Sequence, residues 1–208
     1  MAIDGGLEVV LERSRSLGFL GPGSLRVQAE HAAGFAEVVD RTPARLLDLG
    51  TGGGVPGLVL ADRWRETEVV LLDAAERRCR FLEEAVADLG WSERVRVVRA
   101  RAEDAGRRED LRGGFDLVVA RGFGPPGVTA ECGAPFLRMG GELVVSEPPT
   151  DDDSGRTERW PAQGLARLGL RPAGSWEQPF HYRAFEQAEP CSDRFPRRVG
   201  IPAKRPLF

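Results

Sequence analysis

The residues of this chain best suited to bind a small molecule follow the predicted strands of a sheet. Asp48 ends an apolar run, and Gly50, Gly52 and Gly54 follow it at alternate positions. Such glycines let a ligand approach the backbone, because ligands of open α/β sheets bind beyond the carboxyl ends of strands. The spacing matches the dinucleotide motif G-x-G-x-x-G only loosely, since Val55 stands where the third glycine should be. The loop alone therefore indicates no particular nucleotide.

Two further carboxylates narrow the choice of ligand. Asp73 ends the next apolar segment, where a carboxylate can accept hydrogen bonds from both hydroxyls of a ribose. Glu103 follows a third strand, where it can meet an adenine amino group. A kinase-type phosphate loop would need GK[ST], but the chain's only lysine is Lys204. Three matching strand ends favour S-adenosylmethionine (SAM) or a dinucleotide over a glycine-rich turn without a ligand.

The elements that must position these residues alternate along the chain. The pattern predicts helices over 7–40, interrupted at 21–23, and then strands and helices in turn. The predicted strands cover 45–50, 68–74, 95–100, 115–121 and 141–147. The predicted helices cover 55–64, 76–91, 128–139 and 164–170, with a polar loop over 148–158 and two antiparallel edge strands within 175–190.

This alternation predicts an α/β fold with a seven-stranded, mainly parallel sheet, an antiparallel edge pair and an N-terminal helical extension. We expect the extension to cover 1–40 and one globular unit to cover 41–208.

Composition limits the class of protein. The net charge of −3 gives no global electrostatic case for nucleic acid or an anionic membrane. The three cysteines, Cys79, Cys132 and Cys191, lie far apart and fit no metal-ligand spacing, which favours free thiols in a reducing compartment. No signal peptide or membrane-spanning run is present. We therefore expect a cytoplasmic protein without a metal.

Four segments carry a resemblance to a known family. The segments are LLDLGTGGGVPGL, VVLLDAAERRCRFLEEAVADLG, RARAED and FDLVVARG. In them the chain resembles the GidB/RsmG family, the bacterial 16S ribosomal RNA guanine-N7 methyltransferases. Pro56-Gly57 matches the distinctive part of the family loop, D-x-G-[ST]-G-x-G-x-P-G-[IL]. The ending PRRVGIPAKRPL is similar to the family tail P-R-K-x-G-T-P-x-K-x-P-L. The resemblance implies a Rossmann-like class I SAM-dependent methyltransferase.

The resemblance also implies site residues. By position, the SAM contacts of the family fall on Gly50, Val55, Ala102, Glu103 and Arg121. Together with Asp48, Gly52 and Asp73, these form the predicted cofactor site. Guanine N7 already presents a lone pair, so positioning can do most of the catalysis and no general base is required. No catalytic residue is assigned, and Arg121 is the nearest candidate.

The basic tail is the candidate for contact with RNA. It contains Arg197, Arg198, Lys204 and Arg205. A solvated basic terminus is the alternative interpretation of the same residues. His31 and His181 are the only histidines, and each fits a structural or surface role better than catalysis.

Departures from the family pattern lie on the expected substrate side. The family carries the motifs Asn-Leu-Thr and His-x-x-Asp-Ser-Leu before the first strand. Here His31 is kept, but Gly34 stands at the position of the aspartate, and no Asn-Leu-Thr is present. The family's Lys-Gly after the fifth strand is replaced by Glu147 and a proline, a charge reversal that would repel a phosphate. Arg121 is followed by a Gly/Pro loop instead of Ala.

Three functions follow from these observations. The first is methyl transfer to guanine N7 of small-subunit ribosomal RNA. The alternative is a divergent paralogue that methylates a small molecule, which the substrate-side departures and the acidic net charge favour. The third is a SAM-binding domain without transferase activity.

Overall fold

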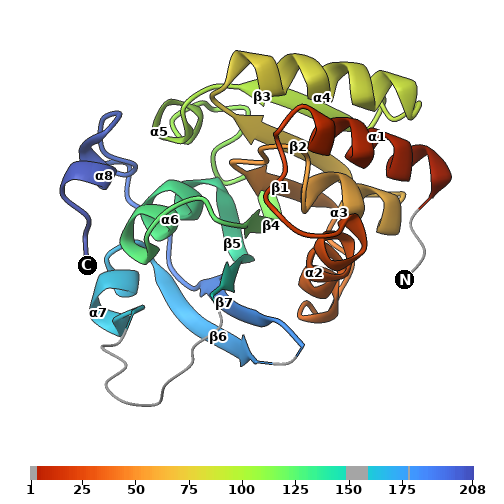
Figure 1. Cartoon of the computed structure of the whole chain (residues 1–208). Helices are drawn as coiled ribbons and strands as arrows, with labels where there is room; N and C mark the ends of the chain where they lie inside the picture. Colours follow the sequence, from red (N-terminus) through yellow and green to blue (C-terminus); the bar gives the residue numbers. More distant parts are fainter. Residues whose placement is uncertain (1–3, 149–158, 178) are drawn as a thin grey trace.

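A single seven-stranded sheet organises the chain. The computed structural model describes residues 4–148, 159–177 and 179–208 (Figure 1). The strand order is β3-β2-β1-β4-β5-β7-β6, which confirms the predicted mixed sheet. The strands are β1 Arg45–Leu49, β2 Glu68–Asp73, β3 Val95–Arg99, β4 Phe115–Ala120, β5 Leu137–Glu147, β6 Leu170–Trp176 and β7 His181–Gln187.

The first five strands are parallel, and β7 runs antiparallel to both of its neighbours, β5 and β6. The order of the strands reverses at β1, which pairs with β2 on one side and with β4 on the other. The carboxyl ends of these strands form the topological switch point at which open α/β sheets bind ligands. The predicted cofactor residues follow these strand ends.

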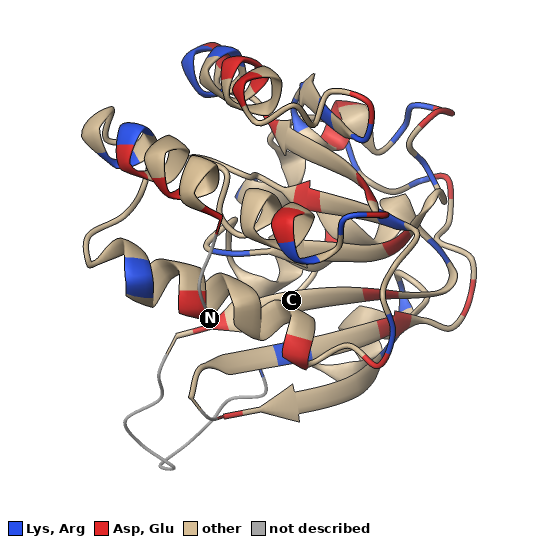
Figure 2. Ribbon diagram, turned by 90° about the vertical axis from the view of Figure 1, so that its right-hand side faces the viewer, with Lys and Arg blue, Asp and Glu red and all other residues tan. Residues whose placement is uncertain are grey.

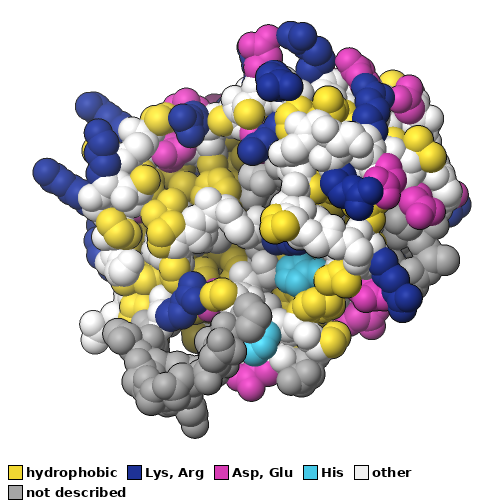
Figure 3. Space-filling view, viewed as in Figure 1, with side chains coloured by type: hydrophobic (Ala, Val, Ile, Leu, Met, Phe, Trp, Pro, Cys, Tyr) yellow, Lys and Arg dark blue, Asp and Glu magenta, His cyan; other side chains and the backbone are white. Residues whose placement is uncertain are grey.

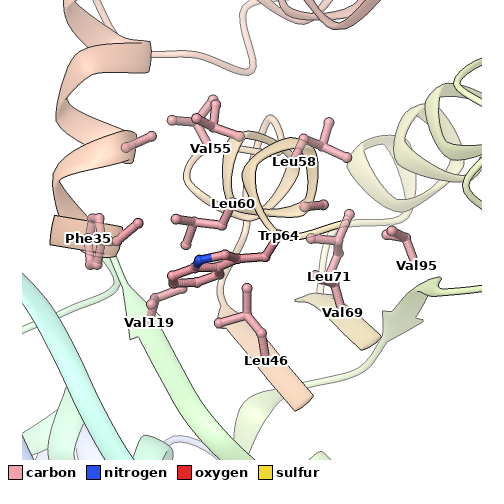
Figure 4. Packing of buried hydrophobic residues seen from close by; sticks show 14 of the residues in the cluster. Phe35, Leu46, Val55, Leu58, Leu60, Trp64, Val69, Leu71, Val95 and Val119 are labelled. Carbon is pink, nitrogen blue, oxygen red and sulfur yellow. The ribbon is translucent and has the colours of Figure 1, made fainter. Parts of the chain in front are cut away.

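Helices cover both faces of the sheet, as parallel strands that are buried on both faces require. The helices are α1 Gly5–Ser16, α2 Leu25–Glu37, α3 Gly57–Arg63, α4 Glu76–Asp88, α5 Ala102–Ala105, α6 Pro126–Gly133, α7 Ala162–Ala166 and α8 Ile201–Lys204, with a 3₁₀ turn at Ala134–Phe136. Successive strand residues point to opposite faces, so Leu46 and Leu47 enter different hydrophobic clusters. Figure 4 shows part of the first cluster, where Leu60 of α3 and Trp64, the residue that follows α3, pack near Leu46.

The N-terminal helices share this first cluster with the sheet. Leu7 and Leu11 of α1 and Phe35 of α2 are buried within it. The Ser14 hydroxyl donates a hydrogen bond to the carbonyl oxygen of Gly53 at 2.9 Å, so α1 is tied to the glycine loop. The N-terminal segment therefore contributes to the architecture around the predicted site.

Two predicted helix and strand boundaries were wrong. The helix expected over 128–139 ends at Gly133, because Pro135 lacks the backbone N–H that would continue it, and residues 137–139 begin β5. The first edge strand lies at 170–176, whereas both edge strands were expected within 175–190. Its first residue, 170, was expected to be the last residue of a helix over 164–170. Pro172 weakens the strand signal there, although an edge strand tolerates proline.

The remaining expectations concern loops, membranes and metals. Apart from Pro148, the polar loop expected over 148–158 lies outside the described residues. No helix found in the described ranges is long and apolar enough to cross a membrane. Those ranges also contain no group of three or more His, Cys, Asp or Glu side chains arranged to hold a metal ion.

Candidate active site

The glycine loop between β1 and α3 adopts a backbone that other residues rarely adopt. Gly50, Gly52 and Gly54 have φ values of 72°, 59° and 95°. Side chains with a Cβ are strained at such angles, so the turn itself requires these three glycines.

The other two glycines of the loop are needed for close packing. A Cβ on Gly53 would overlap the Ser14 hydroxyl of α1, and one on Gly57 would lie 2.6 Å from Asp48 Oδ2. A Cβ on Gly52 would meet nothing closer than 3.9 Å. Among these glycines, Gly52 therefore leaves the most room for a ligand to approach the backbone.

Asp48 is a buried carboxylate with spare hydrogen-bonding capacity. Its side chain is 1% exposed, and Oδ2 accepts a hydrogen bond from Gly57 N at 2.8 Å. Oδ1 and the neighbouring Thr51 Oγ1 are buried, and apart from the interaction of these two side chains with each other they have no partner within the described residues. Burial raises the pKa of Asp48 to about 6. The remaining acceptor capacity of these two oxygens suits a ligand with N–H donors, such as the ammonium group of SAM.

Asp73 is held in a defined position at the end of β2. Its Oδ2 accepts a hydrogen bond from Gly52 N at 3.0 Å, and its Oδ1 accepts one from Ala75 N at 2.8 Å. Arg78 Nη1 lies 3.5 Å from Oδ2. A carboxylate has about four lone-pair sites, so acceptor capacity remains for ribose hydroxyls.

Two more of the predicted residues begin helix α5. Ala102 is the buried first residue of this helix, and Glu103 is half-buried beside it. Glu103 Oε1 accepts a hydrogen bond from Gly200 N at 2.9 Å, a partner in the C-terminal segment that the sequence pattern did not indicate. The second carboxylate oxygen of Glu103 remains available to a ligand.

Arg121 follows β4 and is half-buried. It forms no hydrogen bond or ion pair within the described part of the chain, whereas electrostatic interactions connect it to Asp48, Tyr182 and His31. Burial lowers the pKa of the Arg121 guanidinium. An unpaired, half-buried cation beside the glycine loop suits an anionic group of a ligand.

Phe123 is a site residue that the sequence analysis missed. A Cβ on Gly50 would lie 2.6 Å from Phe123 Cδ2, so the ring covers this glycine from the loop after β4. Val55, the remaining predicted loop contact, is buried immediately before α3. The only available signal for Phe123 was the departure of this loop from the family pattern.

The C-terminal tail is anchored by arginine side chains. Arg197 forms a two-pronged ion pair with Glu131, whose side chain is fully buried (0% exposed), with Nη2 2.6 Å from Oε2. Arg112 donates hydrogen bonds to the carbonyl oxygens of Cys191, Ser192 and Phe195. The geometry gives Arg197 an anchoring role, whereas Arg198, Lys204 and Arg205 are exposed.

Comparison with known proteins decides the family. The family model described as rRNA small subunit methyltransferase G, GidB, matches residues 30–158. Two relatives with the name ribosomal RNA small subunit methyltransferase G are similar along most of their length. The relative from Moorella thermoacetica is 33% identical over 171 residues, which cover 79% of this chain and 70% of the relative. The one from Roseiflexus castenholzii is 35% identical over 175 residues, covering 80% and 72%.

The chain belongs to the GidB family. It is therefore a SAM-dependent methyltransferase, as the sequence motifs implied. The fold agrees with this assignment. An O-methyltransferase from Bacillus cereus in complex with SAH has a TM-score of 0.63 at 16% identity, covering 89% of this chain and 92% of that protein. An SAH-bound methyltransferase from Podospora anserina has a TM-score of 0.63 at 19% identity, covering 89% of each.

The departure of this GidB protein at Gly34 has a structural explanation. A Cβ at Gly34 would overlap the Tyr182 hydroxyl, which donates a hydrogen bond to the carbonyl oxygen of His31. Phe180 also packs on His31, with ring centroids 4.8 Å apart. Burial lowers the pKa of His31 to about 4, so its ring is neutral at pH 7. An aromatic cluster thus stands where the family pattern has an aspartate.

Proposed function

We propose that this GidB protein transfers a methyl group from SAM to guanine N7 of small-subunit ribosomal RNA. The observation that carries the proposal is the arrangement of Asp48, Asp73 and Arg121 around a glycine loop of the family type. The two carboxylates provide hydrogen-bond acceptors, Asp48 for an ammonium group and Asp73 for a ribose. Arg121 provides a cation for a carboxylate. These are the polar groups of SAM.

The proposed binding mode uses each of these side chains once. Asp73 accepts from the ribose hydroxyls, because Gly52 N and Ala75 N already fix its orientation. Asp48 Oδ1 and Thr51 Oγ1 accept from the ammonium group. Arg121 donates to the carboxylate, and Glu103 accepts from the adenine amino group. Gly50, Gly52, Val55 and Ala102 shape the surrounding backbone.

Bound SAM supplies an electrophilic methyl group that an acceptor lone pair takes in an in-line displacement. Guanine N7 carries such a lone pair and loses no proton, so this chain has to orient the acceptor rather than deprotonate it. The structure gives His31 a packing role rather than that of a base, because its carbonyl oxygen accepts a hydrogen bond from Tyr182 and its half-buried ring packs among aromatic side chains. Arg121 is the nearest candidate for a residue that touches both cofactor and acceptor.

The ribosomal RNA itself is proposed to contact the tail. Figure 2 shows basic and acidic positions interleaved across the ribbon, and many of them form pairs, such as Arg63 with Glu37 and Arg171 with Glu186. By contrast, the tail has three exposed cations that form no ion pair with any described residue: Arg198, Lys204 and Arg205. Unpaired cations at an exposed edge suit backbone phosphates. We propose that Arg197 contributes indirectly, by holding the tail through Glu131.

The test uses small ribosomal subunits from a strain that lacks the family enzyme. They are incubated with the protein and labelled SAM, and the digested RNA is analysed for 7-methylguanosine by mass spectrometry. We expect a stoichiometric signal from the wild-type protein and none from Asp73→Asn. SAM binding without 7-methylguanosine would reject this acceptor and favour the small-molecule paralogue. We also propose a cytoplasmic location, because ribosomal RNA, the proposed acceptor, is in the cytoplasm.

A further inference from the structure

A cavity of about 330 Å³ lies beside the end of β5, on the side of the sheet formed by β7 and β6. Its walls include Glu147, Trp160, Trp176, His181, Tyr182 and Phe185. The volume is within the range of about 300–1,000 Å³ that is usual for small-molecule sites. The face of the molecule seen in Figure 3 is hollowed between hydrophobic side chains, and both histidines lie on it.

The walls of the cavity combine flat rings with charged side chains, among them the carboxylates of Glu147 and Glu177. The rings of Trp160 and Phe185 have centroids 4.6 Å apart. The indole Nε1 of Trp160 is buried and has no hydrogen-bond partner within the described residues. The Glu147 side chain is only 12% exposed, and Arg159 Nε lies 3.4 Å from its Oε2, which is a long contact for an ion pair. The carboxylate therefore has capacity for donors from a planar ligand.

The cavity adjoins the proposed cofactor site. Ala120 pairs with Val145, so Arg121 after β4 and Glu147 of β5 lie at the same edge of two neighbouring strands. Tyr182, opposite Ser146 on β7, lines the cavity, and it lies near enough to Arg121 for the guanidinium charge to oppose the rise that burial causes in the pKa of Tyr182. A planar group in the cavity would thus lie beside the residues that we propose to hold SAM.

We propose that this cavity is the pocket for the acceptor guanine and that Glu147 reads its Watson–Crick edge. This inference rests on the proposed function. A carboxylate can accept hydrogen bonds from N1–H and the N2 amino group of guanine together, whereas adenine presents an acceptor at N1. Trp176 is the half-exposed ring among these walls and provides a stacking surface for the flipped base, while the buried rings of Trp160 and Phe185 support the pocket from behind. The glutamate that replaces the family's lysine at position 147 would therefore select guanine over adenine.

The proposed contacts leave the reacting edge of the base free. N7 lies on the opposite edge of the purine from N1 and N2, so its lone pair remains available to form the new bond to the methyl carbon. The electron pair of the broken carbon–sulfur bond stays on sulfur, and no proton is transferred. The purine becomes cationic during this step, and the Glu147 carboxylate stabilises the developing charge.

Nucleoside binding tests the pocket without requiring turnover. Guanosine, inosine and adenosine are titrated against the full chain saturated with S-adenosylhomocysteine, and the change in tryptophan fluorescence, to which Trp160 and Trp176 of the cavity contribute, measures binding. We expect guanosine to bind about tenfold more tightly than inosine, which lacks the 2-amino group. Adenosine should bind more weakly still. Equal binding of guanosine and adenosine, or no binding of guanosine, would overturn the proposal.

The variant Glu147→Gln should lose most of the preference for guanosine over inosine. Glu142→Gln, which changes a glutamate earlier on the same strand, is the matched control and should keep the preference. Thermal unfolding of both variants establishes that they are folded, and Trp176→Phe provides a second, milder change of the cavity wall. An unchanged preference in Glu147→Gln would overturn the assignment of this residue.

A second readout separates this inference from the proposed function. In the ribosomal subunit assay, Glu147→Gln should raise the KM for subunits about tenfold and lower kcat, with an unchanged Kd for SAM. If Glu147→Gln methylates subunits with the wild-type KM, the pocket assignment fails although the proposed function stands. If the wild-type protein binds guanosine selectively but makes no 7-methylguanosine in subunits, the ribosomal acceptor fails although the pocket stands.

Discussion

Glu103 Oε1 accepts a hydrogen bond from the backbone N–H of Gly200, and this bond of 2.9 Å joins helix α5 to the C-terminal segment. The same carboxylate is the proposed partner of the adenine amino group. Two of the segments in which the sequence resembles the GidB family, RARAED and the tail, therefore meet at the proposed cofactor site. Binding of SAM and the position of the tail should be coupled through this side chain.

The first prediction tests this coupling with Glu103→Ala. We expect the variant to bind SAM about tenfold more weakly, because the bond to the adenine amino group is lost, and to lose about 1 kcal/mol of stability, because the bond from Gly200 is lost. Hydrogen exchange at the Gly200 amide should become faster. Asp104→Ala changes the exposed next residue of α5 and should leave SAM affinity and the exchange rate unchanged. Retained protection of Gly200 in Glu103→Ala would contradict the coupling.

The second prediction separates the two requirements for glycine in the loop. Gly50→Ala places a methyl group at a φ of 72° and against the Phe123 ring, so we expect it to cost at least about 1–2 kcal/mol and to abolish SAM binding. Gly90→Ala is the matched control, because Gly90 has a φ of 70° and open space around it. It should cost about 1 kcal/mol and leave the Kd for SAM unchanged, as measured by calorimetry.

The third prediction concerns the tail anchor. Arg197→Met leaves the fully buried Glu131 without its guanidinium partner, and we expect it to destabilise the fold by about 3 kcal/mol or more. Arg198→Met removes an exposed neighbouring cation and should change stability by less than about 0.5 kcal/mol. Chemical denaturation of both variants measures the difference. Equal stabilities would show that the buried pair does not hold the tail.

The fourth prediction follows from His31. Its pKa in the folded state is about 4, below the ordinary 6.5, so the unfolded chain takes up a proton first as the pH falls. The wild-type protein should lose stability through His31 between pH 6.5 and 4, by roughly 2 kcal/mol after allowance for solvent screening. His31→Gln should not show this loss. Thermal unfolding across this pH range tests the difference, and parallel curves would contradict the prediction.

The fifth prediction has the opposite sign, because burial raises the pKa of Asp48 from 3.8 to about 6. The ionised carboxylate costs stability above pH 6, and the cost disappears as the pH falls toward 3.8. Asp48→Asn should therefore be more stable than the wild-type protein at pH 8, by about 2–3 kcal/mol, and nearly equal to it at pH 4. The variant should also bind SAM more weakly. An Asn variant that is less stable at pH 8 would contradict this account.

Much of the fold could be predicted because its signals are local. Strand β2 and helix α4 have continuous or 3.6-residue apolar patterns, and both were found close to their observed positions. The pattern failed at β6, where Pro172 and a register irregularity interrupt the strand. It also failed at the end of α6, where apolar residues continue from helix into strand without a change in composition.

The sequence by itself determined the family, the alternation of strands and helices, and the residues that follow each strand of the switch point. These features are encoded in short motifs whose backbone requirements are local, as at Gly50 and Gly52. Only the tertiary structure decided which distant side chains meet. The structure brings together three pairs of residues that are far apart along the chain: Glu103 with Gly200, Glu131 with Arg197, and Gly34 with Tyr182. Their contacts depend on how the helices and the tail pack on the sheet, and packing between distant segments leaves no periodic signal in a single sequence.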